Sequence, residues 1–507
     1  MPGKKSRGSL GADPAAPGGE EILRSPHGDL DADELRRALH RMADWAADYR
    51  EGIEDRPIQP AVAPGDITAR LPASAPDRGE PLERILADLD SVVMAGVLHW
   101  GHPAFLGYFG STSNGPALLG EIAAAAMNVS AMTWRTSPAA TELESVMLSW
   151  IRQMVGLPDG LTGVVFDTGS TALLHALAVA REGAAGSIRQ RGVAGRRGVP
   201  VCRVYASDQA HSSLEKAMIM LGLGEENAIR VPSDDAFAMD VEALRRTIES
   251  DASRGLRPLA VVATVGSTST ASVDAVAGIA SVCRAHGAWL HVDAAYGGAI
   301  GLLPEKRGLL EGVDQADSVV VNPHKWLFVP LDFSALYLRD PEAMRRLFAL
   351  TPEYLRGDAS AGASGGAVNY MDYGIQLGRR FRALKAWMTF RAFGRDGLAA
   401  RVREHCRLAE LLGRWIDAEP AFERSAPITM SVVCFRRAPE GLDADAADRL
   451  NASIAESVNV SGRAYLTHTR LKGRLVLRVG IGNIQTTELH VRTLWDEVRR
   501  AADRSQV

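Results

Sequence analysis

Lysine is scarce in this chain. Only seven of its 57 Lys+Arg residues are lysine, so arginine is its usual cation. One lysine, Lys325, stands between an apolar run and a tryptophan in the segment "SVVVNPHKWLFVP", residues 318–330. Lysine can lose its proton when it is desolvated, whereas arginine cannot. The choice of lysine therefore indicates that position 325 needs a primary amine.

Cysteine, long apolar runs and an excess of charge are also missing. The four cysteines are far apart and form no CxxC pair, which argues against a disulfide framework and a thiolate metal site and favours a reducing compartment. No apolar run approaches the roughly 20 residues of a membrane helix, and the N-terminus lacks the hydrophobic core of a signal peptide. The net charge of -4 gives no reason to expect nucleic acid or an anionic membrane as a partner. We therefore expect a cytoplasmic protein that acts on small molecules.

Four regions follow one another along the chain. Residues 1–28 are rich in Gly, Pro and Ala and have few large apolar side chains, which predicts a disordered tail. Residues 29–115 predict a helical arm that begins at Asp31 and continues as a Pro-rich extended segment of the kind that wraps a neighbouring chain. Residues 116–393 predict a large α/β domain, and residues 394–507 predict a small α+β domain.

The large domain is predicted from alternating strand-like and helix-like segments. The β-rich runs are "TGVVF", "CRVYAS", "AVVATV", "WLHVD" and "SVVVN". Apolar runs separated by helix-length segments are typical of a mostly parallel sheet with helices on both faces. Such sheets bind ligands outside the carboxyl ends of their strands, so the residues that follow each run are the candidates for a site.

Three strand ends carry groups that one cofactor needs together. Thr168, Gly169 and Ser170 follow "TGVVF" at the start of a helix, where free N–H groups hold a phosphate, although a plain capping turn has the same residue types. Asp293 ends "WLHVD", where a carboxylate needs a cation or a donor. Lys325 follows the next strand, within reach of a crossover. A phosphate cup, an acid for a pyridine nitrogen and a lysine for a Schiff base are the set that pyridoxal 5'-phosphate (PLP) requires.

Plainer interpretations exist for single residues. If Lys325 lay on the surface, its amine would extend to solvent and pair with a carboxylate, but the neighbouring motifs argue against this interpretation. His211 in "SDQAHSS" is, by itself, more typical of a structural histidine. His99 and His102 form an HxxH without a carboxylate or cysteine at ligand spacing, which favours a structural role and no metal.

Five motifs carry a resemblance to a known family. They are "NPHKW", "HVDAAYGG", "SDQAHSSLEKA", "TSPAATELE" and "LGRRFRALK". In this order they resemble the group II PLP-dependent decarboxylases, most closely the aromatic-L-amino-acid decarboxylases, from about Asp31 to the C-terminus. The resemblance implies a PLP fold-type I enzyme and an obligate homodimer. The N-terminal arm would pack on the partner subunit, with active sites at the interface.

The resemblance also implies roles for individual residues. Lys325 is implied to form the Schiff base with PLP, Asp293 to face the pyridine nitrogen, and His211 to stack on the ring. The implied phosphate contacts are Thr168, Gly169, Ser170 and His324, with Asn322 close by, and Thr264 and Ala295 are implied to line the cofactor. Asp167 is a departure, since the family usually has glycine at this turn.

The implied reaction is loss of CO2 from an aromatic L-amino acid, through a quinonoid intermediate, to give the amine. Tyr354, in "TPEYLRG" on a mobile loop, is the implied proton donor, and the run "DASAGASGG" after it suits a hinge. Relatives that consume O2 and form an aldehyde commonly have phenylalanine at this loop position, and some have asparagine in place of His211. Tyr354 and His211 therefore favour amine formation, with the oxidative aldehyde synthase as the alternative. A non-catalytic PLP-binding protein is disfavoured by the intact Lys325, Asp293 and Tyr354.

The resemblance finally implies a pocket for the substrate side chain. Its residues are Trp100, Tyr108 and Phe109, with Ser130 and Met132 where the animal enzymes have larger apolar groups from the partner subunit, and Gln376, which also departs from the animal pattern. Aromatic residues at the spacing of the first three are often plain core. These departures leave tryptophan, tyrosine, dopa, phenylalanine and nonstandard aromatic acids open as substrates.

Overall fold

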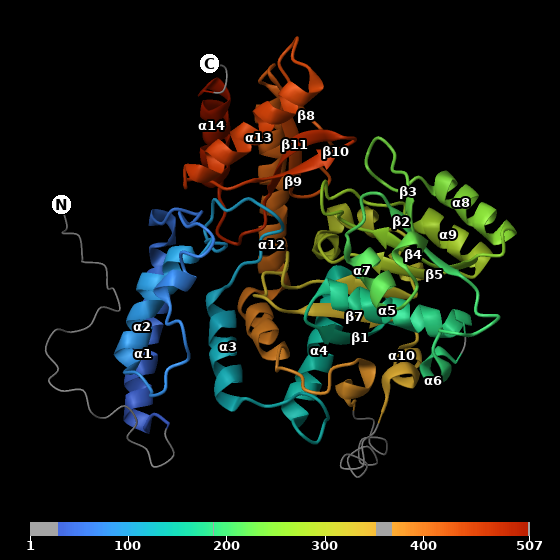
Figure 1. Cartoon of the computed structure of the whole chain (residues 1–507), viewed down its shortest axis with the longest axis horizontal. Coiled ribbons are helices and arrows are strands. Elements are labelled where there is room, and N and C mark those ends of the chain that lie inside the picture. Colours follow the sequence, from blue (N-terminus) through green and yellow to red (C-terminus); the bar gives the residue numbers. More distant parts are fainter. Residues whose placement is uncertain (1–28, 186, 351–367, 505–507) are drawn as a thin grey trace, which may run out of the picture.

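A seven-stranded sheet forms the centre of the large domain in this computed structural model, which describes residues 29–185, 187–350 and 368–504 (Figure 1). The strand order is β1-β7-β6-β5-β4-β2-β3; β7 is antiparallel to both neighbours and the other four adjacent pairs are parallel. The strands are β1 (Thr162–Phe166), β2 (Cys202–Ser207), β3 (Ala228–Val231), β4 (Arg257–Thr264), β5 (Trp289–Asp293), β6 (Ser318–Val321) and β7 (Ser334–Leu338). The predicted mostly parallel α/β sheet is confirmed, and the carboxyl ends of β1, β2, β4, β5 and β6 share one edge.

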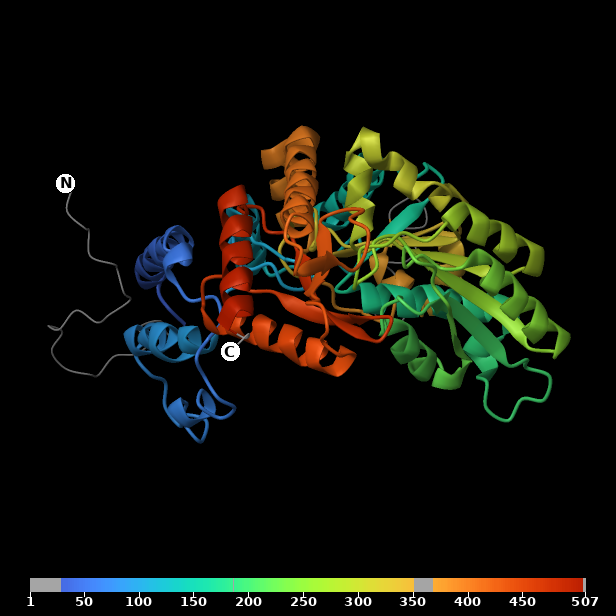
Figure 2. The ribbon, with the colours of Figure 1, turned by 90° about the horizontal axis from the view of Figure 1, so that it is seen from above.

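Helices cover both faces of this sheet because its strands are apolar on both sides. Every residue of β7 is buried, as is every residue of β4 except the first. Helices α5 and α7 lie on one face, and helices α4, α8 and α9 lie on the other (Figure 2). The helices of this domain are α3 (Gly115–Met127), α4 (Pro138–Val155), α5 (Gly169–Ala185), α6 (Ile188–Arg191), α7 (Ser213–Met220), α8 (Val241–Ser253), α9 (Val276–His286) and α10 (Pro341–Phe348).

A four-stranded antiparallel sheet carries the small C-terminal domain. Its order is β10-β11-β9-β8. The strands are β8 (Phe422–Arg424), β9 (Val432–Arg437), β10 (Thr467–Leu471) and β11 (Arg474–Gly480), and the helices are α13 (Ala444–Val460) and α14 (Glu488–Arg504). The long helix α12 (Ala383–Asp417) runs from the large domain to this sheet (Figure 1). Gly394, with a φ of 62°, interrupts α12 at the place where the sequence suggests a domain boundary.

The N-terminal arm begins with α1 (Ala32–Glu51), where the sequence predicts a helix start. The Asp31 side chain accepts from the N–H of Glu34, and the Glu34 side chain accepts from the N–H of Asp31, so a capping box starts the helix. The Pro-rich segment that follows is mostly irregular and leads to α2 (Leu82–Asp88). In Figure 2 this blue arm stands to one side of both sheets.

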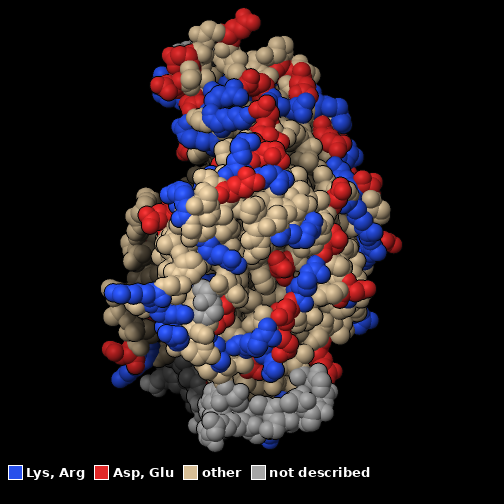
Figure 3. Space-filling model, turned by 90° about the vertical axis from the view of Figure 1, so that its right-hand side faces the viewer, with Lys and Arg blue, Asp and Glu red and all other residues tan. Residues whose placement is uncertain are grey.

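The surface carries side chains of both charges (Figure 3). Among the described residues, no helix is long and apolar enough to cross a membrane. On the face that Figure 3 shows, acidic and basic side chains are interspersed over the coloured residues. The predicted tail, residues 1–28, and Tyr354 with its loop lie outside the described residues.

Candidate functional site

The ends of β5 and β6 bring the two key predicted groups together. The N–H of Ala295 donates to Oδ1 of Asp293 (3.0 Å), and the carbonyl of Ala295 accepts from the N–H of Asn322 (3.0 Å). The carbonyl of Asn322 accepts from the N–H of Lys325 (2.9 Å). Three successive hydrogen bonds therefore join the turn of the acid to the turn of the amine, at the edge of the sheet where ligands bind.

Lys325 places its amine in a partly buried position beside charged and aromatic groups. Its Nζ lies 5.1 Å from the ring centroid of Phe109. Burial lowers the pKa of Lys325, the carboxylate of Asp293 opposes this shift, and the guanidinium of Arg478 adds to it. A lowered pKa increases the neutral fraction of the amine, which is the form that attacks an aldehyde.

Arg478 is a site residue that the sequence reasoning missed. It lies on β11 of the small domain, is 4% exposed, and its Cζ lies 4.8 Å from the ring centroid of Phe109. Its Nε donates to the carbonyls of residues 268 and 269, and one terminal nitrogen donates to the carbonyl of Tyr108 (2.6 Å). The other terminal nitrogen is buried and has no partner in the described part of the chain. A buried N–H without an acceptor is costly, so this nitrogen is available for an anionic ligand.

The start of α5 lies where the sequence predicts the phosphate cup. The first N–H groups of a helix have no acceptor within the helix, and here the N–H of Thr171 donates to the hydroxyl of Thr168 (3.3 Å). A Cβ on Gly169 would lie 3.0 Å from Nδ2 of Asn322, so glycine permits a close approach between these two segments. The hydroxyl of Ser334 donates to Oδ1 of Asn322 (2.6 Å) and fixes the amide.

The structure also gives the protonation of His324 and the hydrogen bond of Asp167, two residues near this helix start. Nδ1 of His324 accepts from the N–H of Phe333 (3.0 Å), and burial lowers the pKa of His324 to about 3, so the ring is neutral at pH 7. The carboxylate of Asp167 accepts from the N–H of Thr168 (2.7 Å). This bond gives Asp167, unusual at this position, a local role in holding the turn.

His211 and Thr264 border the same space. Nδ1 of His211 accepts from the N–H of Ser213 (3.1 Å). Desolvation lowers the pKa of His211, Asp293 raises it and Lys325 lowers it, so the ring lies within electrostatic reach of both groups. Thr264 pairs with Asp293 in the β4–β5 register, and its buried hydroxyl has no partner among the described residues. This hydroxyl is free for a ligand.

Comparison with known proteins decides the family. The family model described as the pyridoxal-dependent decarboxylase conserved domain matches residues 64–438. The chain belongs to the pyridoxal-dependent decarboxylase family. It is therefore a PLP-dependent carboxy-lyase of fold-type I, and the resemblance read from the sequence is confirmed.

Full-length relatives support this assignment. Tryptophan decarboxylase 2 of Oryza sativa subsp. japonica is 38% identical over 494 residues, 96% of this chain and 97% of the relative. Phenylacetaldehyde synthase of Arabidopsis thaliana is 36% identical over 481 residues, 93% and 96% of the two chains. A crystal structure of Oryza sativa TDC with PLP and tryptamine superposes with a TM-score of 0.90 at 36% identity, covering 95% of this chain and 99% of that one. Similar identity to a decarboxylase and to an aldehyde synthase does not separate the two reactions.

The residues of this decarboxylase fit PLP. A neutralisable amine lies near a carboxylate, as a Schiff base and a pyridine nitrogen require. A side chain at position 169 would press against Asn322. Because residue 169 is glycine, the start of α5 stays open for a phosphate. The unpartnered hydroxyl of Thr264 supplies a further polar contact.

The predicted substrate residues fall into three groups. Phe109 lies against Lys325, while Trp100 and Tyr108 stack on each other (5.4 Å between centroids) in a separate aromatic cluster with Phe105. The third group contacts the segment 371–379. The hydroxyl of Ser130 accepts from the N–H of Arg379, the carbonyl of Met132 accepts from the N–H of Met371, and the half-buried Gln376 lies within that segment.

The HxxH pair makes ordinary contacts in the arm. Nδ1 of His99 lies 3.0 Å from the hydroxyl of Tyr49, and Nδ1 of His102 accepts from the N–H of Ala104 (2.9 Å). Burial lowers the pKa of His102 to about 4, so its ring is neutral at pH 7. Both histidine rings therefore make contacts within the fold.

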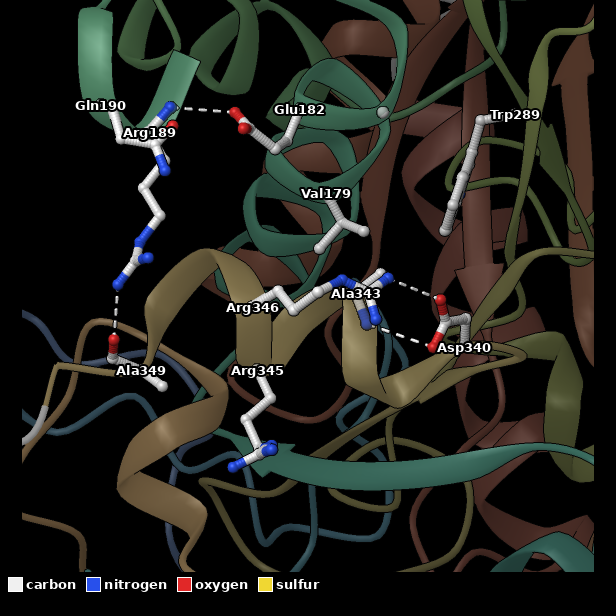
Figure 4. A pocket seen from close by; sticks show the side chains of 11 residues that line it. Val179, Glu182, Arg189, Gln190, Trp289, Asp340, Ala343, Arg345, Arg346 and Ala349 are labelled. Carbon is white, nitrogen blue, oxygen red and sulfur yellow. Dashed lines mark hydrogen bonds and ion pairs between the residues drawn. The ribbon is translucent and has the colours of Figure 1, made fainter. Parts of the chain in front are cut away.

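A separate hollow of about 760 Å³ lies between α5 and α10 (Figure 4). Trp289 on its wall begins β5, whereas Asp293 ends that strand, so the hollow is at the opposite end of the strand from the cofactor residues. Its polar groups already have partners: Arg346 forms an ion pair with Asp340 (2.9 Å), the backbone N–H of Arg189 donates to the carboxylate of Glu182 (2.9 Å), and the guanidinium of Arg189 donates to the carbonyl of Ala349 (2.6 Å). We assign no ligand to it.

Proposed function

We propose that this decarboxylase converts an aromatic L-amino acid to its amine and CO2, with PLP attached to Lys325. The observation that carries the proposal is the shared environment of Lys325, Asp293 and Arg478: an amine, an anion and an unsatisfied cation around one space. The relatives whose names specify tryptophan decarboxylase and phenylacetaldehyde synthase support an aromatic substrate.

Each group has a definite task. Bound PLP supplies an electron sink for the pair released as the carboxylate leaves. Lys325 would hold PLP through its amine, whose lowered pKa favours the neutral, nucleophilic form. Asp293 keeps the pyridine nitrogen protonated, because a carboxylate in a desolvated site favours a cation beside it. Residues assigned to the phosphate are Thr168, Gly169, Ser170, Asn322 and His324; residues assigned to the ring are His211, Thr264 and Ala295.

Arg478 is suited to the substrate carboxylate. The free terminal N–H of its guanidinium is charged, buried and close to Lys325. A charge-assisted hydrogen bond from this group would orient the carboxylate without a competing water. The ring of Phe109 lies against both Arg478 and Lys325 and would give the substrate an apolar wall. We propose that Trp100, Tyr108, Ser130, Met132 and Gln376 shape the pocket further out.

The amine-forming reaction is tested by product analysis under controlled oxygen. Purified protein incubated with tryptophan, tyrosine, dopa and phenylalanine is expected to release amine and CO2 in equal amounts without consuming O2. Tyr354→Phe, which removes the proposed proton donor, is expected to lower amine formation about 100-fold and to divert product to the aldehyde. Tyr373→Phe, which removes a phenol from a nearby segment, serves as the control. Hydrogen peroxide and aldehyde from the unaltered protein would instead identify an oxidative aldehyde synthase.

We also propose a cytoplasmic homodimer in which the arm, residues 29–115, packs on the partner subunit. Within the arm, Leu35 and Leu39 of α1 are exposed. Helix α3, which follows the arm at the start of the large domain, is apolar yet exposes Leu119, Ile122 and Met127. Exposed large apolar side chains of this kind are typical of a protein interface.

Leu119→Asp is expected to dissociate the dimer, since a charge would be buried in an apolar interface. Sedimentation would then show the mass of one chain, 54.3 kDa, where the unaltered protein shows twice that value. Val201→Asp is the matched control: Val201 is 51% exposed and Leu119 is 60% exposed, but Val201 lies beside β2, at the other side of the molecule (Figure 1). Dissociation by both changes, or by neither, would contradict the assignment of α3.

A further inference from the structure

A column of four rings connects the amine-bearing segment with α12. Trp326, which follows Lys325, stacks on Tyr296 with 4.6 Å between centroids and 7° between planes. Tyr296 stacks on Phe109 (3.9 Å, 19°), and Trp326 lies parallel to His405 (6.5 Å, 6°). Phe109 is the ring against which Lys325 and Arg478 lie. This aromatic column, Phe109, Tyr296, Trp326 and His405, therefore ends at the reactive amine.

Hydrogen bonds fix the other end of the column. The indole N–H of Trp326 points to Nδ1 of His405 (3.0 Å), and Nε2 of His405 lies 3.0 Å from the carbonyl oxygen of Asn483. An indole nitrogen only donates and a carbonyl only accepts, so His405 must be neutral with its proton on Nε2. Burial lowers the pKa of His405 to about 3, in agreement with this tautomer.

The hydrogen bonds of His405 and Asn483 connect α12, the small domain and the arm. His405 lies on α12 and is completely buried. The side chain of Asn483, in the small domain, donates to the carbonyls of Gly101 (2.9 Å) and His102 (3.1 Å) in the arm. The hydroxyl of Tyr296 also bonds to Ser431, which in turn donates to the carbonyl of residue 481. These hydrogen bonds connect the rings beside Lys325 with the small domain and the arm.

We propose that His405 is a positioning residue. It accepts a hydrogen bond from the indole N–H of Trp326 and so fixes the position of the aromatic column, and the column in turn fixes the position of Phe109 against Lys325 and Arg478. His405 touches neither substrate nor cofactor in this assignment. The inference rests on the attachment of PLP at Lys325, and it adds a residue distant from the site that controls how that cofactor is held.

The test compares two amide substitutions of His405, each of which reproduces one of the two ring nitrogens. In His405→Asn the amide oxygen replaces Nδ1 and still accepts from Trp326, whereas in His405→Gln the amide nitrogen replaces Nε2 and keeps only the bond to Asn483. We expect His405→Gln to weaken PLP binding about three- to thirtyfold, and to reduce the visible circular dichroism of bound PLP, which reports how rigidly the ring is held. We expect His405→Asn to stay within about twofold of the unaltered protein in both measurements.

The melting temperature and a second variant, Trp326→Phe, distinguish a positioning role of His405 from a role in folding. Both amides replace a buried ring and will lower the melting temperature, so a change of melting temperature alone does not support the proposal. Equal PLP affinity and equal dichroism in the two variants, or a larger loss in His405→Asn, would overturn it. Should His405→Gln fail to fold, Trp326→Phe, which keeps the stacked ring and removes the donor, is expected to show the same spectral loss; full dichroism in that variant would also overturn the proposal. Lys325→Ala removes the covalent PLP signal whatever residue is at 405, so failure of the attachment is recognised separately.

Discussion

Lys325→Ala is expected to abolish the visible absorbance of covalently bound PLP and to lower decarboxylation about 10,000-fold or more. In the proposed function the amine at 325 would hold the cofactor beside the substrate, and groups held in place in this way have very large effective concentrations. Absorbance spectroscopy of the purified protein and product formation under saturating PLP measure the two effects.

Two other lysine changes sharpen this experiment. Lys325→Arg keeps the positive charge but supplies a guanidinium that does not lose its proton, so it is expected to be as inactive as the alanine variant. Lys472→Ala removes a half-exposed lysine that pairs with Asp235, and it is expected to leave both absorbance and activity unchanged. An active arginine variant would show that position 325 contributes charge and no covalent bond.

Asp293→Asn is expected to lower decarboxylation about 100-fold or more, while PLP stays bound. The amide has nearly the shape of the carboxylate but no charge, so the pyridine nitrogen loses the anion that keeps it protonated and the ring becomes a poorer electron sink. Oδ1 of Asp293 also accepts from the N–H of Ala295 (3.0 Å), and the amide oxygen of asparagine can keep that bond. Turnover and PLP content, measured on the same sample, distinguish loss of chemistry from loss of cofactor.

A cofactor analogue provides the decisive control for Asp293. A PLP derivative methylated on the ring nitrogen is permanently cationic, and it is expected to restore part of the activity of Asp293→Asn while giving the unaltered protein no gain. Asp293→Glu keeps the charge at a displaced position, and its activity is expected to lie between that of Asp293→Asn and that of the unaltered protein. If the methylated cofactor restores nothing, the carboxylate acts through the structure of the β5 turn and not through the ring.

Much of the site could be predicted because its residues follow strand ends. Asp293 and Lys325 come directly after apolar runs, and the carboxyl ends of parallel strands meet at one edge, so local pattern was sufficient to bring them together. The scarcity of lysine singled out position 325, and the family motifs named His211 and His324. The strands β1, β2 and β5 were predicted with the bounds that the structure shows.

Other elements could not be predicted from local pattern. β3 has four residues, and β10, whose side chains alternate between partly buried and exposed positions, is stabilised by pairing with β11. β7 was missed because it follows the lysine segment without a helix-length crossover and returns antiparallel between β1 and β6. The pairing of such strands depends on neighbours that are distant in sequence.

The sequence by itself determined the α/β fold, the family and the choice of Lys325 as the candidate for PLP attachment, because periodicity and motifs are local properties of the chain. Only the tertiary structure decided that Arg478 of the small domain lies beside Lys325 and that His405 of α12 accepts from Trp326. Neither residue has a local signal, since an arginine in a strand and a histidine in a helix are ordinary. Their roles arise when the packing of two domains buries a charged nitrogen and an imidazole where water cannot satisfy them.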